Sequence, residues 1–593
     1  MYYPTLEEDS NTRSMIDKWY GYNHNYLTNS GEFFDMENLT SDYFPLMAPR
    51  KTRALLKEYS NIRGIVYTNN TVYVLDGDVL KHGDITTDLS GYMDNTGEST
   101  QQTLLRFGAY ILIFPLGIYI NIYDHGIGRM AMSYETGENV EITYSICEMD
   151  GEDFDSVTAA DTAPTSPKDG DYWLNTGKDS GLNIWYNSKS MWQPVATTHI
   201  RIRIPGAQLT KRFKQYDTIF MNTELTDINN GSQIVTIADD YIVVTGIMSG
   251  TVEKTQTTSS SWKLKLERRI PALDYVCTDK NRVWGCHYGY SADGEMMNEI
   301  YCSKLADFCN WYTYQSISTD SYAVNVGVTG EWTGCISYRN HPVFFKENAI
   351  FTVYGSYPSE YQIVQNDCRG VQLGSSKSLA IVGETLFYKS ASDVCAYDGS
   401  TPTGISDAFG RDQLYYDAVG GGCLNKYHVS MSNAKGKHYF FTYDISHAIW
   451  EKESELQIEM FSSTENGQIY GATKTKLYGF GSTDNILYLN PYKDEEWVKW
   501  YAETGEIGYE TPDSKYVNRI SIRAYIPVRS EIVVEISHDD QKYVNASTLR
   551  GANDIISKTI DIYPARCDRF KIRFSGHGDC RIYSMSLSTE YGG

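Results

Sequence analysis

The sequence lacks the short motifs that carry many enzymatic reactions. It contains no Gly-x-x-x-x-Gly-Lys-Ser/Thr loop, no His-Glu-x-x-His pair and no Gly-x-Ser-x-Gly elbow. Phosphate-loop, zinc-protease and serine-hydrolase sites of those types are therefore not predicted. No Cys-x-x-Cys pair occurs and no histidine spacing matches a zinc site, so we expect neither a metal nor a cofactor. Glycoside hydrolysis needs only two carboxylates about 5 to 9 Å apart, and that alternative stays open.

Long apolar runs and positive charge are also scarce. The most apolar stretch, residues 109–122, is too short to cross a membrane and contains Pro115 and Gly117, so no membrane insertion is expected. The 11 cysteines are scattered, which favours buried free thiols and synthesis in a reducing cytosol. The net charge of −23 argues against wrapping nucleic acid on a basic surface. An acidic wall would instead let DNA slide past without binding.

Short strand-like runs recur along much of the chain. Each unit holds β-branched or aromatic runs that are too short for helices and are separated by turn residues. Such units bury their faces by stacking on their neighbours, and meanders of this size match the blades of a β-propeller. The alternative is an open protein of several ordinary sheets. The seven units cover residues 62–77, 104–124, 274–311, 333–355, 378–399, 427–444 and 458–481.

The predicted fold class is all-β, with a propeller of about seven blades, inserted small β domains and a C-terminal β-sandwich. A short helix is expected around residues 11–19, within an extended N-terminal arm of residues 1–60. Alternating strands after residue 485 indicate the sandwich, which we expect to be of the jelly-roll kind. The remaining segments are blades at 61–125, inserted domains at 126–270, blades at 271–485 and the sandwich at 486–593.

Two sets of side chains are candidates for binding. The arm carries polar, aromatic and basic residues that could contact another domain, another subunit or phosphate; the alternative is a solvated surface strand. In the insert, Trp173, Trp185 and Trp192 could stack on a sugar, or they could form the small core of their own module. The arm residues are Asn38, Tyr43, Phe44, Arg50, Lys51 and Arg53.

Several of these segments resemble structural proteins of tailed bacteriophages. Asn38-Leu39, residues 41–46 and the run Pro49-Arg50-Lys51-Thr52-Arg53 resemble the opening of tail nozzle, or tail tubular B-like, proteins, although Arg50-Lys51-Thr52 replaces their Arg-Pro-Gly-like motif. Residues 282–311 and the C-terminal strands resemble the same proteins. The Gly-Asp-Tyr-Trp run that ends at Trp173 resembles a hairpin module of phage tail and fibre proteins.

The resemblance implies a structural virion protein, made in the host cytoplasm, and not an enzyme. Rings of about six copies would surround a channel that conducts DNA without sequence-specific binding, between a head–tail adaptor or portal-side protein and tail fibres. Two rival functions remain at this point. One is an adsorption protein that binds host-surface glycan, and the other is a propeller enzyme that cleaves glycan.

Overall fold

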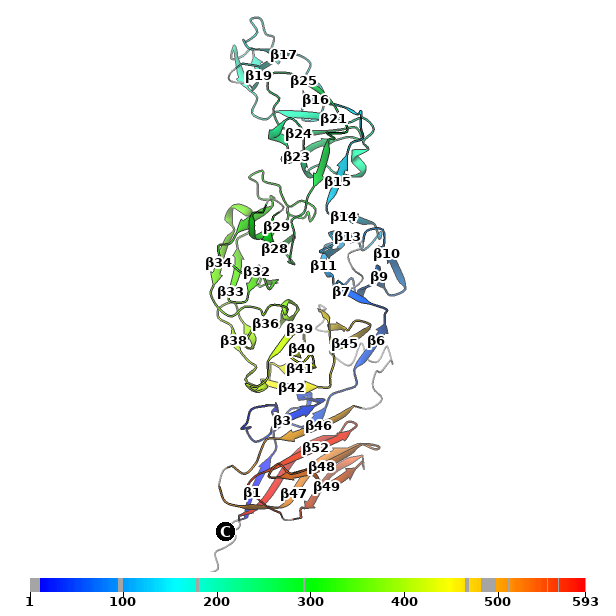
Figure 1. The fold of residues 1–593 in the computed structure, drawn as a ribbon, viewed down its shortest axis with the longest axis vertical. Coiled ribbons are helices and arrows are strands. Elements are labelled where there is room, and N and C mark those ends of the chain that lie inside the picture. Colours follow the sequence, from blue (N-terminus) through cyan, green and yellow to red (C-terminus); the bar gives the residue numbers. More distant parts are fainter. Residues whose placement is uncertain are drawn as a thin grey trace, which may run out of the picture. The chain divides into compact units, whose positions relative to one another are not determined.

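The computed structural model is built almost wholly from β-strands (Figure 1). The described residues form 53 strands and six short 3-10 helices, with no α-helix among them, and none of their helices is long and apolar enough to span a membrane. Contacts divide the chain into two compact units, residues 1–101, 344–351 and 365–593, and residues 102–343 and 352–364. The structure describes residues 11–93, 100–177, 181–291, 294–463, 469–480, 498–509, 512–551, 553–563 and 565–591.

Seven antiparallel sheets of four strands confirm the predicted repeat and form the blades of a β-propeller. The first blades are β7 (Ile62–Thr68), β8 (Thr71–Asp76), β9 (Val79–His82) and β10 (Ile85–Asp88), then β11 (Thr103–Phe107), β12 (Tyr110–Phe114), β13 (Ile118–Asn121) and β14 (Ile127–Arg129). The next are β27 (Tyr275–Asp279), β28 (Arg282–Tyr290), β29 (Met296–Cys302) and β30 (Tyr322–Asn325), then β31 (Gly334–Tyr338), β32 (His341–Lys346), β33 (Ala349–Tyr354) and β34 (Gln362–Asn366).

The last three blades follow without interruption along the chain. They are β35 (Ala380–Val382), β36 (Thr385–Lys389), β37 (Val394–Tyr397) and β38 (Thr403–Gly404), then β39 (Tyr415–Cys423), β40 (Lys426–Asn433), β41 (His438–Asp444) and β42 (Ile449–Glu453), then β43 (Met460–Ser463), β44 (Ile469–Ala472) and β45 (Lys476–Phe480). The sequence predicted three strands in five of the units and two in residues 62–77 and 427–444. The structure has four in each blade, because most of the added strands are short and partly exposed and give no apolar signal. The added strand β42 is buried, but its charged residues interrupt the apolar pattern.

One turn recurs in the first hairpin of six blades. Its loop has two residues, and in three blades both have positive φ: Asn69-Asn70, Lys280-Asn281 and Arg339-Asn340. Two such residues are typical of a type I′ turn, whose twist matches that of the flanking strands, and asparagine tolerates this conformation well. The two-residue loop sets the register of these six hairpins, and three of them share the same turn conformation.

The fourth strand of the last blade comes from the N-terminal segment. β6 (Ala54–Glu58) pairs with β45 in the sheet order β43-β44-β45-β6, with Glu58 opposite Lys476. More than 400 residues of sequence lie between these two strands, so the pairing joins the beginning of the blade series to its end. Leu56 and Leu477 pack in the same apolar cluster as Ile62 and Val74 of the first blade.

The insert between the second and third blades has its own core. Its larger sheet has the order β15-β26-β22-β23-β24-β21-β16-β25, and its smaller sheet is β17-β18-β19-β20. Ile142, Ile200 and Ile242 are fully buried between the strands. The strands are β15 (Met132–Glu135), β16 (Glu141–Cys147), β17 (Val157–Ala160), β18 (Tyr172–Asn175), β19 (Gly181–Tyr186), β20 (Met191–Pro194), β21 (His199–Arg203), β22 (Thr218–Met221), β23 (Asn230–Ile237), β24 (Tyr241–Thr245), β25 (Glu253–Thr257) and β26 (Lys265–Arg268).

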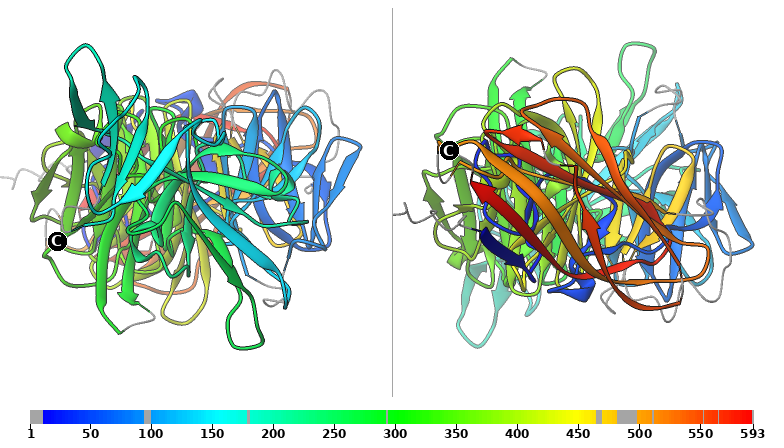
Figure 2. Two further views of the ribbon diagram at one scale, coloured as in Figure 1. Left: turned by 90° about the horizontal axis from the view of Figure 1, so that it is seen from above. Right: turned by 90° about the horizontal axis from the view of Figure 1, so that it is seen from below.

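Two further sheets combine strands from both ends of the chain (Figure 2, right, orange and red). Their orders are β1-β53-β47-β50 and β2-β3-β46-β52-β48-β49, and their apolar residues join one buried cluster. Residues after 485 thus do not form these sheets alone, and a jelly-roll connectivity stays a prediction. The strands are β1 (Asn11–Ile16), β2 (Gly21–Tyr22), β3 (Glu32–Glu37), β46 (Lys499–Thr504), β47 (Lys515–Ile526), β48 (Glu531–His538), β49 (Val544–Arg550), β50 (Asp554–Asp561), β51 (Arg566–Cys567), β52 (Phe570–His577) and β53 (Arg581–Tyr591).

The helix predicted near residues 11–19 is wrong. Residues 11–16 are strand β1, which pairs with β53 from Asn11 opposite Glu590 to Ile16 opposite Met585. Tertiary pairing outweighs local propensity here, because the edge of β53 has backbone N–H and C=O groups that a neighbouring strand can pair with and a helix cannot. The predicted boundary at residues 485 and 486 lies outside the described residues.

The cysteines are free thiols, and most of them are buried in the sheets. This agrees with the prediction of buried thiols. Burial raises the pKa of the Cys147 thiol to about 11 and those of Cys302 and Cys309 to about 12. These thiols are accordingly uncharged at neutral pH and pack as small apolar groups.

Candidate functional site

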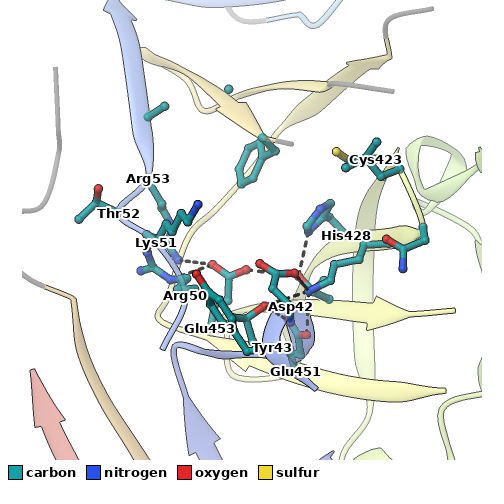
Figure 3. A pocket seen from close by; sticks show the side chains of 18 residues that line it. Asp42, Tyr43, Arg50, Lys51, Thr52, Arg53, Cys423, His428, Glu451 and Glu453 are labelled. Atoms are coloured by element: carbon teal, nitrogen blue, oxygen red, sulfur yellow. Dashed lines mark hydrogen bonds and ion pairs between the residues drawn. The ribbon is translucent and has the colours of Figure 1, made fainter. Parts of the chain in front are cut away.

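A cavity of about 390 Å³ lies beside the N-terminal segment, where residues 40–54 meet strands β40 to β42 (Figure 3). Its walls carry both signs of charge, and most of the charged side chains are at least partly buried. Such a cavity is the natural place to look for an active site. The charged and titratable residues that line it are Asp42, Arg50, Lys51, Arg53, Lys426, His428, Glu451 and Glu453.

Lys426 neutralises two of the three carboxylates. Its Nζ lies 2.8 Å from Asp42 Oδ1 and 2.9 Å from Glu451 Oε1, and it donates a further hydrogen bond to Thr40 Oγ1. Burial lowers the pKa of Lys426, but the carboxylates of Glu451 and Asp42 outweigh burial and raise the pKa overall. The ammonium therefore stays charged and is held between a loop residue and a strand residue.

Two arginines neutralise Glu453. Arg50 Nε lies 3.1 Å and Arg53 Nη2 3.3 Å from Glu453 Oε2. Burial raises the pKa of Glu453, but the two guanidinium groups outweigh it and hold the pKa below its usual value. Behind this carboxylate, Thr442 Oγ1 donates to Glu453 Oε1 at 3.3 Å and lies 2.8 Å from His428 Nδ1. Burial lowers the pKa of His428 to about 4, so its ring is neutral at pH 7.

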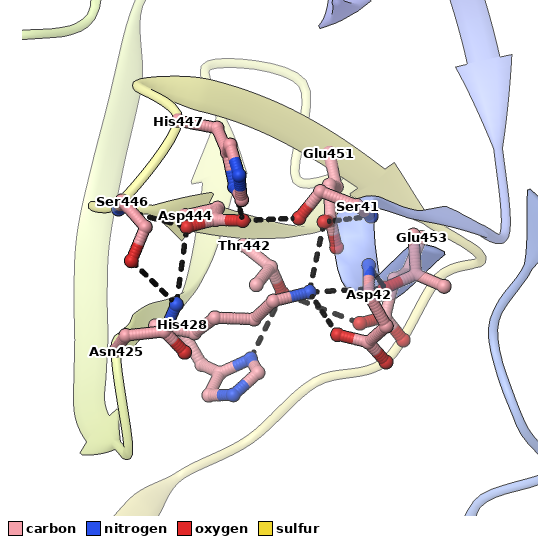
Figure 4. A network of polar contacts seen from close by, with 12 residues as sticks. Ser41, Asp42, Asn425, His428, Thr442, Asp444, Ser446, His447, Glu451 and Glu453 are labelled. Carbon is pink, nitrogen blue, oxygen red and sulfur yellow. Dashed lines mark hydrogen bonds and ion pairs between the residues drawn. The ribbon is translucent and has the colours of Figure 1, made fainter. Parts of the chain in front are cut away.

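A second polar network adjoins the cavity and contains serine, histidine and aspartate (Figure 4). Ser41 Oγ donates to Asp444 Oδ2 at 2.5 Å, and His447 Nδ1 lies 2.9 Å from the same oxygen. In a hydrolase triad the serine hydroxyl is hydrogen-bonded to the histidine, which takes its proton. Here both side chains converge on the aspartate, so the serine is not activated as a nucleophile.

The charged side chains of the cavity therefore hold the N-terminal segment in place. A glycosidase needs one carboxylic acid and one carboxylate that face the same substrate bond, whereas Glu451 and Glu453 are both paired with cations. The partners lie about 400 residues apart in the sequence, and the bonds fasten residues 38–53 to β42. No group of three or more metal-ligating side chains occurs in the part of the chain that the structure describes.

The arm residues predicted to bind partners mostly bind their own chain. Asn38 Oδ1 accepts hydrogen bonds from Arg50 Nε at 2.9 Å and from the Ser454 amide at 2.8 Å. Asn38 Nδ2 donates to the Lys499 carbonyl at 2.8 Å. Arg53 donates to the Ser454 carbonyl at 2.8 Å. These polar side chains thus hold the arm against β42 and β46.

The aromatic members of the arm also pack within the chain, whereas Lys51 lies at the exposed wall of the cavity. The Tyr43 ring lies 4.2 Å from the Arg581 guanidinium, and the Phe44 ring lies 4.4 Å from the His447 ring. Lys426, His428, Glu451 and Glu453 were not predicted as site residues from the sequence. The available signal was Glu451-Lys452-Glu453, which places two carboxylates on the inward face of a strand.

The three candidate tryptophans share one face of the smaller insert sheet. Trp185 is opposite Trp192 on β19 and β20, and Trp173 is opposite Asn183 on β18, so all three side chains point the same way. Trp192 is the middle ring, 5.7 Å from Trp173 and 5.4 Å from Trp185. The three rings are partly exposed.

The opposite face of that sheet carries the buried residues. Leu174 and Leu182 are almost fully buried and join the core of the larger insert sheet. The indole N–H of Trp173 donates to the Ala160 carbonyl at 3.0 Å, and that of Trp185 donates to Asn187 Oδ1 at 2.8 Å. The tryptophans therefore form an aromatic face with fixed rings on the side away from this core.

Comparison with known proteins finds likenesses only among solved structures. No family model matches the chain, and no curated protein matches it. An exo-β-1,3-galactanase from Phanerochaete chrysosporium is 8% identical and covers 53% of this chain and 94% of its own, with a TM-score of 0.21. U3-55K is 7% identical and covers 72% and 97%, with a TM-score of 0.30. Trypanosoma rangeli sialidase is 8% identical and covers 68% and 93%, with a TM-score of 0.24.

Likenesses of this size carry no information about function. The galactanase and the sialidase act on glycans, but that statement concerns those proteins. The function of this chain has to be inferred from its own residues.

Replacing Lys426 by methionine should destabilise the protein strongly. The change leaves Glu451 buried without its cation, which costs about 3–5 kcal/mol when one partner of a buried pair is removed. The matched change Arg550→Met removes a cation that is 84% exposed and lies 4.0 Å from Glu531, and it should cost less than about 1 kcal/mol. Urea unfolding of both variants measures the difference. Equal losses would show that the Lys426 network does not hold the fold.

His428 should make the protein less stable as the pH falls from 6.5 to about 4. Its pKa is depressed in the folded state, so the stability it contributes is present above pH 6.5 and is lost as the pH falls towards the folded value. His428→Phe keeps an aromatic ring but cannot titrate. Between pH 7 and 4, wild type should lose up to about 3 kcal/mol relative to this variant in thermal or urea unfolding. A difference that is independent of pH would contradict the assignment.

Proposed function

We propose that this chain is a structural subunit of a tailed-phage particle, of the tail nozzle type, and that it assembles into a ring around a DNA channel. The observation that carries the proposal concerns residues 38–53, which bear much of the resemblance to such proteins. Their polar side chains Asn38, Arg50 and Arg53 fasten the arm to β42 of the sixth blade and to β46. The residues of the motif thus have an architectural role, as expected of a subunit that bears load.

The charge of the chain fits the same role. With a net charge of −23, the surface repels phosphate, so DNA would pass without being held. The partners implied are about six copies of the chain, a head–tail adaptor or portal-side protein, and tail fibres, and the place of action is the tail of the virion. The alternative of a glycan-cleaving enzyme gains no support from the cavity, because its three carboxylates, Asp42, Glu451 and Glu453, are paired with cations.

Electron microscopy of the purified chain and of the phage particle tests this function. We expect closed rings of about six copies at high protein concentration, and density for the chain at the tail. The sign of the charge on the inner wall of the ring should be negative. A chain that stays monomeric at high concentration and is absent from virions would overturn the proposal.

Glycan binding is the second candidate function, and the aromatic face of the insert favours it. Trp173, Trp185 and Trp192 are fixed on one face with their ring surfaces partly exposed, the arrangement on which the apolar faces of sugars stack. An amide group for hydrogen bonding to hydroxyls lies beside this face at Asn187, whose Oδ1 accepts from the Trp185 indole.

A glycan array followed by calorimetry tests this candidate. Trp192→Ala removes the central ring and should weaken any glycan bound by wild type about tenfold, or about 1.4 kcal/mol. Tyr186→Ala is the matched control, because Tyr186 is 39% exposed on the opposite side of β19. No glycan retained by wild type, or equal losses in the two variants, would remove the aromatic face as a sugar site.

A further inference from the structure

The outer face of the sheet β1-β53-β47-β50 carries arginines and hydroxyls, and we name it the arginine face. Residues paired across strands point to the same side of a sheet, so the register places Arg13, Ser588, Arg519 and Asp561 in one row. Arg523 lies between Ser584 and Ser557 in a parallel row. The register also places on this face the hydroxyl side chains of Ser521, Tyr525, Thr559 and Ser586, together with Met15 and Glu590.

The opposite face of this sheet is apolar and closed. Ile520, Ile560 and Leu587 belong to the buried cluster shared with the second sheet. The outer face is therefore the only face of this sheet that can meet another molecule.

Positive charge on the arginine face is only partly neutralised. Arg13 Nη2 donates to Ser586 Oγ at 3.2 Å and Arg523 Nε donates to Ser557 Oγ at 3.3 Å, and neither has an ion pair within the described residues. Arg519 Nε lies 3.2 Å from Asp561 Oδ1, but both side chains are exposed, so the pair is weak. Arg13, Arg519 and Arg523 outnumber the carboxylates of Asp561 and Glu590 on this face, so it keeps a small positive excess that complements an acidic surface.

The insert supplies a matching acidic surface in the turn of residues 148–155, which we name the acidic turn. Glu148, Asp150, Glu152 and Asp155 are exposed, and none has an ion pair within the described ranges. The turn is held in shape by Arg201, which donates to the Gly151 carbonyl at 2.6 Å and pairs with Asp153 at 2.7 Å. Its carboxylates are thus presented on a supported turn.

We propose that the arginine face of one copy binds the acidic turn of a second copy. Two different patches meet in such a contact, so it is head-to-tail and repeats from copy to copy, which generates a ring where the rotation closes. The inference deepens the proposed ring assembly and rests on it, because it names the surfaces that join neighbouring subunits. Exposed charges of this kind contribute mainly to the rate and specificity of association and are screened by salt.

Charge reversal in the full chain tests the contact. The variants are Arg519→Glu with Arg523→Glu, and Glu148→Lys with Asp150→Lys and Glu152→Lys. Arg550→Glu is the control, because this arginine is 84% exposed on β49 of the second sheet. Sedimentation velocity in about 0.05 M and about 0.5 M NaCl measures self-association, and a DNA duplex is titrated in parallel.

Each reversed variant should self-associate roughly tenfold more weakly than wild type at low salt, and an equimolar mixture of the two should recover association. Arg550→Glu should behave as wild type does. The inference is overturned if Arg519→Glu/Arg523→Glu associates as strongly as wild type, or if the mixture of the two variants does not recover association. It is also overturned if wild type never self-associates, or if the arginine face binds only the DNA duplex. Rings that persist in both variants would defeat this contact and leave the ring proposal standing. Charge-dependent association of a chain absent from virions would defeat the ring proposal alone.

Discussion

The last blade has a bare edge until the N-terminal segment covers it. A sheet edge exposes unpaired N–H and C=O groups, which costs free energy when they are buried and invites aggregation when they are not. β6 satisfies the edge of β45, and β3 and β1 do the same for β46 and β53. Residues 11–60 are therefore part of four sheets, and β6 completes the last of a series of blades that otherwise repeats a local hairpin design.

Ion pairs also hold the N-terminal segment in place. Burying Glu451 and Glu453 is costly without counter-charges. Lys426, on the neighbouring strand β40, supplies one to Glu451, and Arg50 and Arg53 supply them to Glu453 across a sequence separation of about 400 residues. Groups committed in this way are poorly placed to exchange protons with a substrate. The charged side chains that line the cavity thereby hold the N-terminal segment on β42.

Local pattern predicted the repeat well, and tertiary pairing accounts for what it missed. The seven blades were predictable because their inner strands are short, apolar and separated by turn residues such as Asn69-Asn70. The pairings of β6 and β1 could not be predicted, because the sequences of residues 54–58 and 11–16 do not indicate a partner strand hundreds of residues away. The candidate residues differ in the same way. Trp173, Trp185 and Trp192 share a face, as the alternation of side chains along strands allows. Lys426 and Glu453 could not be identified as paired charges without knowing that Asp42 and Arg50 lie beside them.

The central claim is that the N-terminal segment is an integral part of the fold that closes the last blade. Hydrogen exchange followed by mass spectrometry tests this most directly on residues 54–58 and 476–480. Amides of β6, and those of β45 that face β6, should be protected and should lose protection together as denaturant is added, since β45 is the only strand that pairs with β6 among the described residues. Exchange of residues 54–58 at the rate of an unstructured peptide, with residues 476–480 still protected, would contradict it.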